Sequence, residues 1–150
     1  MLRSVLVFAL VLAVTVVLGS TAHSLFVMDA WANAAGQAAG TGPAPLTFAD
    51  RTGWIEHDIV GMAPLYATLV AIALLVAFVA SGLLARVTGL RTIVFAVAGA
   101  VAMFVLFETV KAMLGTVGVF GARGAIGLAA QAAVGAVAGI LFATLKPAAS

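Results

Sequence analysis

Four long stretches of the sequence are almost entirely apolar. They run over about residues 4–28, 62–85, 92–113 and 125–145. A helix that crosses about 30 Å of hydrocarbon needs about 20 such residues, because each residue adds about 1.5 Å. These stretches lack the alternation of polar and apolar residues that marks a membrane strand. The sequence therefore predicts an all-α, polytopic membrane protein built as a bundle of four transmembrane helices.

The composition excludes most other classes of protein. Of the 150 residues, 65% are hydrophobic and 8% are charged, whereas a soluble domain has about 25% charged residues. A soluble enzyme, a disordered chain and a nucleic-acid-binding protein are thereby set aside. The chain has no cysteine, which removes disulfides, thiolate catalysis and iron–sulfur clusters. The length predicts a single membrane domain over residues 1–150.

The connections between the predicted spans are unequal. The first is a long polar loop over 29–61, with a Gly/Pro-rich segment, GQAAGTGPAP, that we expect to be irregular. Within this loop the sequence predicts a short interfacial helix from Thr47 to Asp58. Asp50 follows Thr47 by three residues, as in a capping box. The other two connections are short, RVTGLR over 86–91 and GTVGVFGARG over 115–124.

The distribution of basic residues predicts the orientation. Arg3, Arg86, Arg91 and Lys146 fall on one side of the four spans, and Arg51, Lys111 and Arg123 on the other. Because short cytoplasmic flanks carry the excess of Lys and Arg, we expect both termini in the cytoplasm and the 29–61 loop outside. The Ala-, Gly- and Val-rich composition favours a bacterial inner membrane.

The N-terminus allows a second interpretation. Arg3, the apolar run that follows it and Ser20-Thr21-Ala22 also fit a cleaved signal peptide. Apolar sequence resumes at 25–28, and retention of the segment gives an even number of spans. We favour retention.

Small residues recur every four positions in the last span and so form one helix face. They are Gly127, Gly135 and Gly139, with Gln131 as the polar member. Such faces let helices approach closely. We favour the interior of the bundle as their location, with an interface to a homo-oligomer or to another membrane subunit as the alternative. An unpaired amide in hydrocarbon costs several kcal/mol, so we expect Gln131 to bond to a neighbouring helix.

Six ionisable residues map to one layer near the outer boundary of the spans. Glu108 lies about 24 Å along the third span, and His23 about 30 Å along the first. The set is His23, His57, Asp58, Glu108, Lys111 and Arg123. Ionisable groups inside a membrane are candidates for function. The alternatives are a structural ion pair between Glu108 and Lys111 or Arg123, and a ligand or proton site. Arg123 and its Gly-rich loop could also hold an anionic lipid headgroup.

The two histidines raise the question of a cofactor. His23 and His57 could be axial ligands of haem, or could bind copper or zinc with Asp58. We favour hydrogen-bonded interface residues and expect no cofactor. The common catalytic motifs are missing from the sequence. The first hypothesis is therefore a non-catalytic accessory or assembly subunit that packs through small-residue helix faces. The alternatives are a small proton-coupled transporter that uses Glu108 with Lys111 or Arg123, and a haem or copper protein.

Overall fold

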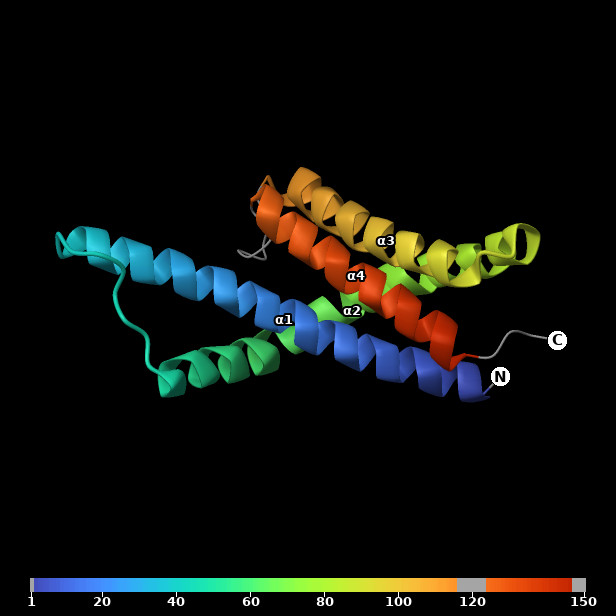
Figure 1. Ribbon diagram of the computed structural model, residues 1–150, viewed down its shortest axis with the longest axis horizontal. Coiled ribbons are helices and arrows are strands. Elements are labelled where there is room, and N and C mark those ends of the chain that lie inside the picture. The colour runs from blue at the N-terminus through green and yellow to red at the C-terminus, as the bar shows by residue number, and fades with distance from the viewer. Residues whose placement is uncertain (1, 116–123, 147–150) are drawn as a thin grey trace.

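The computed structural model describes residues 2–115 and 124–146, and this part of the chain contains four helices and no strand. The helices are α1 (Leu2–Ala38), α2 (Phe48–Thr88), α3 (Arg91–Leu114) and α4 (Ala125–Leu145). All four are long and apolar enough to cross a membrane, which confirms the predicted bundle. Consecutive helices run in opposite directions, and α1 also packs against α4 (Figure 1).

Two of the helices extend well beyond the predicted spans. The third and fourth spans agree with α3 and α4 to within one residue, but α1 has 37 residues and α2 has 41. The predicted loop over 29–61 is therefore mostly helical, with non-helical chain only over 39–47. The segment that lengthens α1 is rich in alanine, the residue with the highest helix propensity. That preference outweighs the polarity from which the loop was predicted.

The predicted interfacial helix exists only as the first part of α2. Thr47 is the N-cap of α2 and forms the expected capping box with Asp50. The backbone N–H of Thr47 donates to Asp50 Oδ2 at 2.9 Å, and the Asp50 N–H donates to Thr47 Oγ1 at 3.2 Å. The helix does not end at Asp58, however, but continues through Pro64 into the second span. The prediction of a separate short helix was wrong, because nothing between Asp58 and the span terminates the helix.

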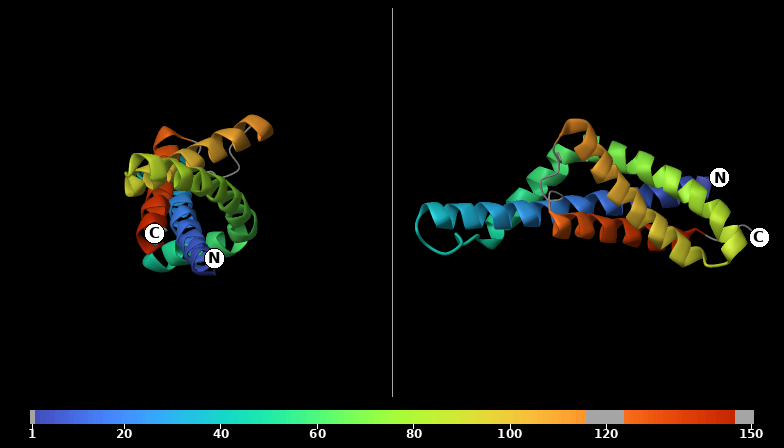
Figure 2. Two further views of the ribbon diagram at one scale, coloured as in Figure 1. Left: turned by 90° about the vertical axis from the view of Figure 1, so that its right-hand side faces the viewer. Right: turned by 90° about the horizontal axis from the view of Figure 1, so that it is seen from above.

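Residues 29–61 form a distal hairpin, at the end of the bundle opposite the start of α1 and the end of α4. The end of α1 and the start of α2 project beyond α3 and α4 and are joined by the loop over 39–47 (Figure 2). The rings of Trp31 and Trp54 lie 6.2 Å apart across it. The Ala44 N–H donates to the carbonyl of Ala32 at 2.9 Å, which holds the loop against α1. We call the opposite end of the bundle the basal end. It contains the start of α1, the turn between α2 and α3, and the end of α4 (Figure 1).

Glycines set the distance between α3 and α4. A Cβ at Gly99 of α3 would lie 2.0 Å from the carbonyl oxygen of Gly135, and a Cβ at Gly139 would lie 1.9 Å from that of Phe95. Gly127, Gln131, Gly135 and Gly139 are all buried in this monomer. The small-residue face of α4 is therefore inside the bundle, as favoured, and is not free to contact a partner.

Candidate functional site

A buried hydrogen-bonded node joins three helices in the distal half of the bundle. Gln131 of α4 is 1% exposed. Its Nε2 donates to the carbonyl of Gly19 on α1 at 3.0 Å, and its Oε1 accepts from the hydroxyl of Tyr66 on α2 at 2.9 Å. Both ends of the amide are thus satisfied within the protein. Gln131 makes the interhelical hydrogen bonds expected of it, to two helices where one was expected.

The fourth helix reaches the same level through an aromatic contact. The Phe107 ring of α3 stacks on the Tyr66 ring, with centroids 6.4 Å apart and planes 27° apart. Gly19 gives Tyr66 its space, because a Cβ there would lie 2.0 Å from the tyrosine hydroxyl. The node therefore contains one residue from each helix: Gly19, Tyr66, Phe107 and Gln131.

A polar seam lies between α1 and α2, distal to the node. Ser20, His23 and Ser24 are all buried on α1. The Ser24 hydroxyl lies 2.7 Å from Asp58 Oδ2 and 3.0 Å from the carbonyl of Ser20, so it can donate to either. The hydroxyl oxygen of Ser20 has no hydrogen-bond partner among the described residues. Of the predicted site residues, Asp58 lies in this seam through its bond to Ser24, and His23 is buried on α1 one residue before Ser24.

Glu108 and Lys111 form their own pair on α3. Their side chains are three residues apart on one helix face, and Lys111 Nζ lies 3.8 Å from Glu108 Oε2. The Glu108 side chain is 43% exposed and the Lys111 side chain is 58% exposed. Phe107, the residue before Glu108, belongs to the node, so this pair lies at the level of the node but on the outer surface of the bundle. The predicted layer thus divides into a buried seam and an exposed ion pair.

The remaining predicted residues do not complete a metal site within the described part of the chain. His57 is exposed on α2, although its neighbour Asp58 is partly buried and bonds to α1. Across residues 2–115 and 124–146, no three His, Asp or Glu side chains lie close enough to hold a metal ion together. Arg123 and most of its Gly-rich loop fall outside the described residues.

Three of the polar residues in this region, Tyr66, Ser20 and Ser24, were not identified from the sequence as site residues. Tyr66 is the single tyrosine of the chain, and its position inside an apolar span is the signal that could have identified it. Ser20 and Ser24 are four residues apart and therefore share a face of α1. In the sequence only Ser20 stands out, as part of the alternative cleavage site. Comparison with protein-family models, curated proteins and solved structures finds no match for this chain.

Proposed function

We propose that the chain is a non-catalytic subunit of a bacterial inner-membrane assembly, in which the four-helix bundle anchors the distal hairpin for contact with a partner. The observation that carries this proposal is the hairpin itself. Two helices continue beyond the apolar spans and contact each other through Trp31 and Trp54, and the Ala44–Ala32 hydrogen bond holds the connecting loop against α1. Such a projection presents a surface beyond the apolar spans.

The charge of the distal hairpin supports a role in recognition. It carries Asp29, Asp50, Glu56 and Asp58 against a single basic residue, Arg51. Trp31 is 46% exposed and Phe48 is 83% exposed. Exposed aromatic residues beside charged groups are typical of protein interfaces and of the membrane boundary. The proposed partner is a membrane subunit with a basic outer surface.

The excess of basic residues at the basal end supports an orientation with both termini in the cytoplasm. Retention of the first helix is part of the proposal. Val11, Thr15 and Gly19 all precede the alternative cleavage site and are buried in the bundle. Cleavage after Ala22 would remove Gly19, the acceptor for Gln131.

Purification from native membranes in a mild detergent tests the proposal. We expect a larger subunit to copurify in fixed stoichiometry, and the double substitution Asp29→Lys and Glu56→Lys to release it. Both side chains are exposed, so the bundle should stay folded. Thr92→Lys adds a positive charge on the exposed surface at the basal end and should leave the complex intact. A complex that is unaffected by the hairpin substitutions would contradict the proposal.

A proton-coupled transporter is the second candidate, and the polar seam favours it. Ser24 and Asp58 place a hydroxyl and a carboxylate together across the α1–α2 interface, and Ser20 and His23 are buried polar residues of the same part of α1. In reconstituted vesicles this function predicts that Asp58→Asn abolishes proton flux. Glu108→Gln tests the exposed pair in the same assay. Absence of flux from the unmodified protein would eliminate this candidate and leave the first one standing.

A further inference from the structure

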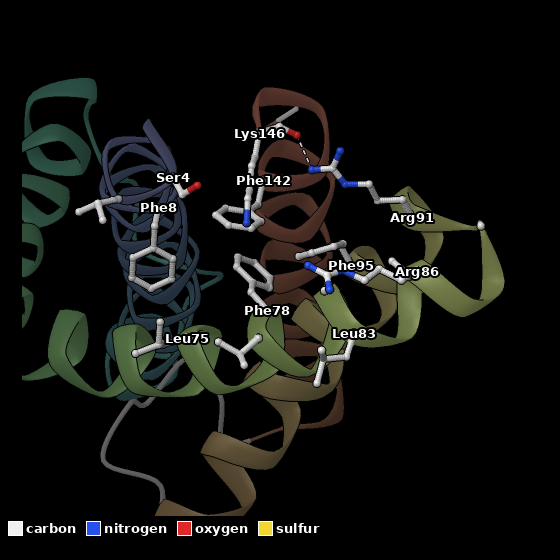
Figure 3. A pocket seen from close by; sticks show the side chains of 15 residues that line it. Ser4, Phe8, Leu75, Phe78, Leu83, Arg86, Arg91, Phe95, Phe142 and Lys146 are labelled. Atoms are coloured by element: carbon white, nitrogen blue, oxygen red, sulfur yellow. Dashed lines mark hydrogen bonds between the residues drawn. The ribbon is translucent and has the colours of Figure 1, made fainter. Parts of the chain in front are cut away.

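A cavity of about 940 Å³ lies at the basal end of the bundle. Its interior is aromatic, and each helix supplies one ring: Phe8, Phe78, Phe95 and Phe142 (Figure 3). The rings of Phe78 and Phe142 stack at 4.7 Å, and Phe95 lies 5.4 Å from Phe142. The cavity therefore has a continuous apolar floor that reaches the centre of the bundle.

One side of the cavity is open at the outer surface of the bundle. Leu75, Val79 and Leu83 line it along α2, and each is more than half exposed. Gly82 lies on the same stretch of α2, where an added Cβ would meet nothing within 4 Å. In a membrane, a gap of this kind between α1 and α2 is open to lipid chains.

Three basic side chains surround the aromatic floor. Arg86, Arg91 and Lys146 all line the cavity (Figure 3). The Arg91 guanidinium lies 5.9 Å from the centre of the Phe95 ring, and Lys146 Nζ lies 5.4 Å from that of Phe142. Arg91 also donates a hydrogen bond to the backbone carbonyl of Lys146. Two of the three cations are thus held over the rings instead of extending into solvent.

No acidic residue balances these charges. The chain has five Asp and Glu residues, and none of them lines the cavity. Four are in the distal hairpin, and Glu108 is paired with Lys111. An unbalanced basic cluster next to an apolar cavity at a membrane boundary is complementary to a molecule with an anionic head and an apolar tail.

We propose that the basal cavity binds an anionic phospholipid. Arg86, Arg91 and Lys146 hold the phosphate of the headgroup, and one acyl chain enters between α1 and α2 to lie on the phenylalanine floor. Arg86 is eight residues from Phe78, about 12 Å along the helix, so a single lipid spans both parts of the site. This proposal does not depend on the function proposed above.

Native mass spectrometry of the full chain in mild detergent tests the proposal. The probes are phosphatidylglycerol and phosphatidylcholine with identical acyl chains, offered in equal amounts. We expect preferential retention of phosphatidylglycerol, reduced about fivefold by each of Arg86→Gln and Lys146→Gln. Arg51→Gln removes one exposed positive charge in the distal hairpin and should have no effect. Arg91 is left unchanged because it braces the end of α4.

A second pair of variants tests the acyl-chain part of the site. Gly82→Leu should place a side chain in the path of the acyl chain and lower retention of phosphatidylglycerol with all three cations in place. Gly61→Leu is the control, because that glycine also has open space around it but does not line the cavity. Glycerol phosphate, the soluble headgroup analogue, should not displace the lipid. Equal retention of the two lipids, equal effects of Arg86→Gln and Arg51→Gln, or full displacement by glycerol phosphate would each overturn the proposal.

Discussion

At the residue scale, Gln131 connects the helices more directly than any other polar side chain described. Its amide bonds to α1 and α2 at once, and interhelical hydrogen bonds in membranes contribute about 0.6 kcal/mol on average and up to about 1.7 kcal/mol. Replacing it also leaves the Gly19 carbonyl and the Tyr66 hydroxyl without this partner. A buried amide therefore specifies which helix faces meet, in addition to stabilising their contact.

Gln131→Leu should lower the free energy of unfolding by about 1–2 kcal/mol, because two interhelical hydrogen bonds are lost at nearly constant volume. A double-mutant cycle with Tyr66→Phe, followed by denaturation in mixed detergent, measures the coupling. We expect the pair to couple by about 1 kcal/mol. Purely additive effects of the two substitutions would show that the Tyr66–Gln131 bond does not stabilise the bundle.

The start of α2 should depend on pH through Asp50. Hydrogen bonds from the side chain and then the backbone of Thr47 lower the pKa of this carboxyl below its ordinary value. A carboxyl whose pKa is lower in the folded state stabilises the fold above its unfolded pKa of about 4. That stabilisation is lost as the pH falls through the lower folded value. Acidification should therefore loosen the capping box from about pH 4 downwards.

Carboxyl NMR shifts of Asp50 measure this effect. We expect Thr47→Ala to return the pKa of Asp50 towards its ordinary value, because both the hydroxyl donor and the geometry of the cap are lost. Thr52→Ala is the matched control, since the Thr52 hydroxyl bonds only to the carbonyls of Phe48 and Ala49 in the structure. An Asp50 titration that is the same in both variants would refute the role of the capping box.

At the scale of elements, the sequence predicts the helices better than it predicts their ends. Hydrophobic length alone locates α3 and α4, because lipid-facing helices need an apolar residue at nearly every position. The same criterion cannot locate the end of α1 or the start of α2, because both helices continue into sequence of lower hydropathy. Only a capping signal such as Thr47 marks such a boundary, and α1 has no comparable signal near Met28.

The sequence predicts the depth of the candidate site residues along their helices but not which of them contact one another. Counting along each helix places Glu108 and His23 at similar depth, but depth does not say which way a side chain points. Glu108 points away from the core and pairs with Lys111, whereas Asp58 reaches Ser24 because α1 and α2 are in contact beyond the spans. Orientation and the pairing of helices come from tertiary packing, which the sequence of a single chain does not specify.

The contact between α3 and α4 should be the least tolerant of added volume. Gly99→Ala places a Cβ 2.0 Å from a backbone oxygen of α4, so the two helices must separate. We expect a loss of about 1–3 kcal/mol in the free energy of unfolding. Gly82→Ala, where nothing lies within 4 Å, should cause no loss. Equal stability of the two variants would contradict the close approach of α3 and α4.

At the scale of the whole molecule, charge is separated along the long axis. The distal hairpin carries four acidic residues, and the basal end carries Arg3, Arg86, Arg91 and Lys146. Apolar helices separate the two ends. This separation supports the proposed orientation in the membrane. It also agrees with the two different roles proposed for the two ends: protein contact at the distal hairpin, and binding of anionic lipid at the basal cavity.

If the four helices cross the membrane, the distal hairpin and the α2–α3 turn must lie on opposite faces of it. The chain has no native cysteine, so single cysteines report position without background. Thr41→Cys lies in the hairpin loop and Val87→Cys lies near the α2–α3 turn, and both positions are exposed. In intact cells a membrane-impermeant maleimide should label Thr41→Cys, and should label Val87→Cys only after the membrane is opened. Labelling of both positions from the same side would show that the helices between them do not cross the membrane as proposed.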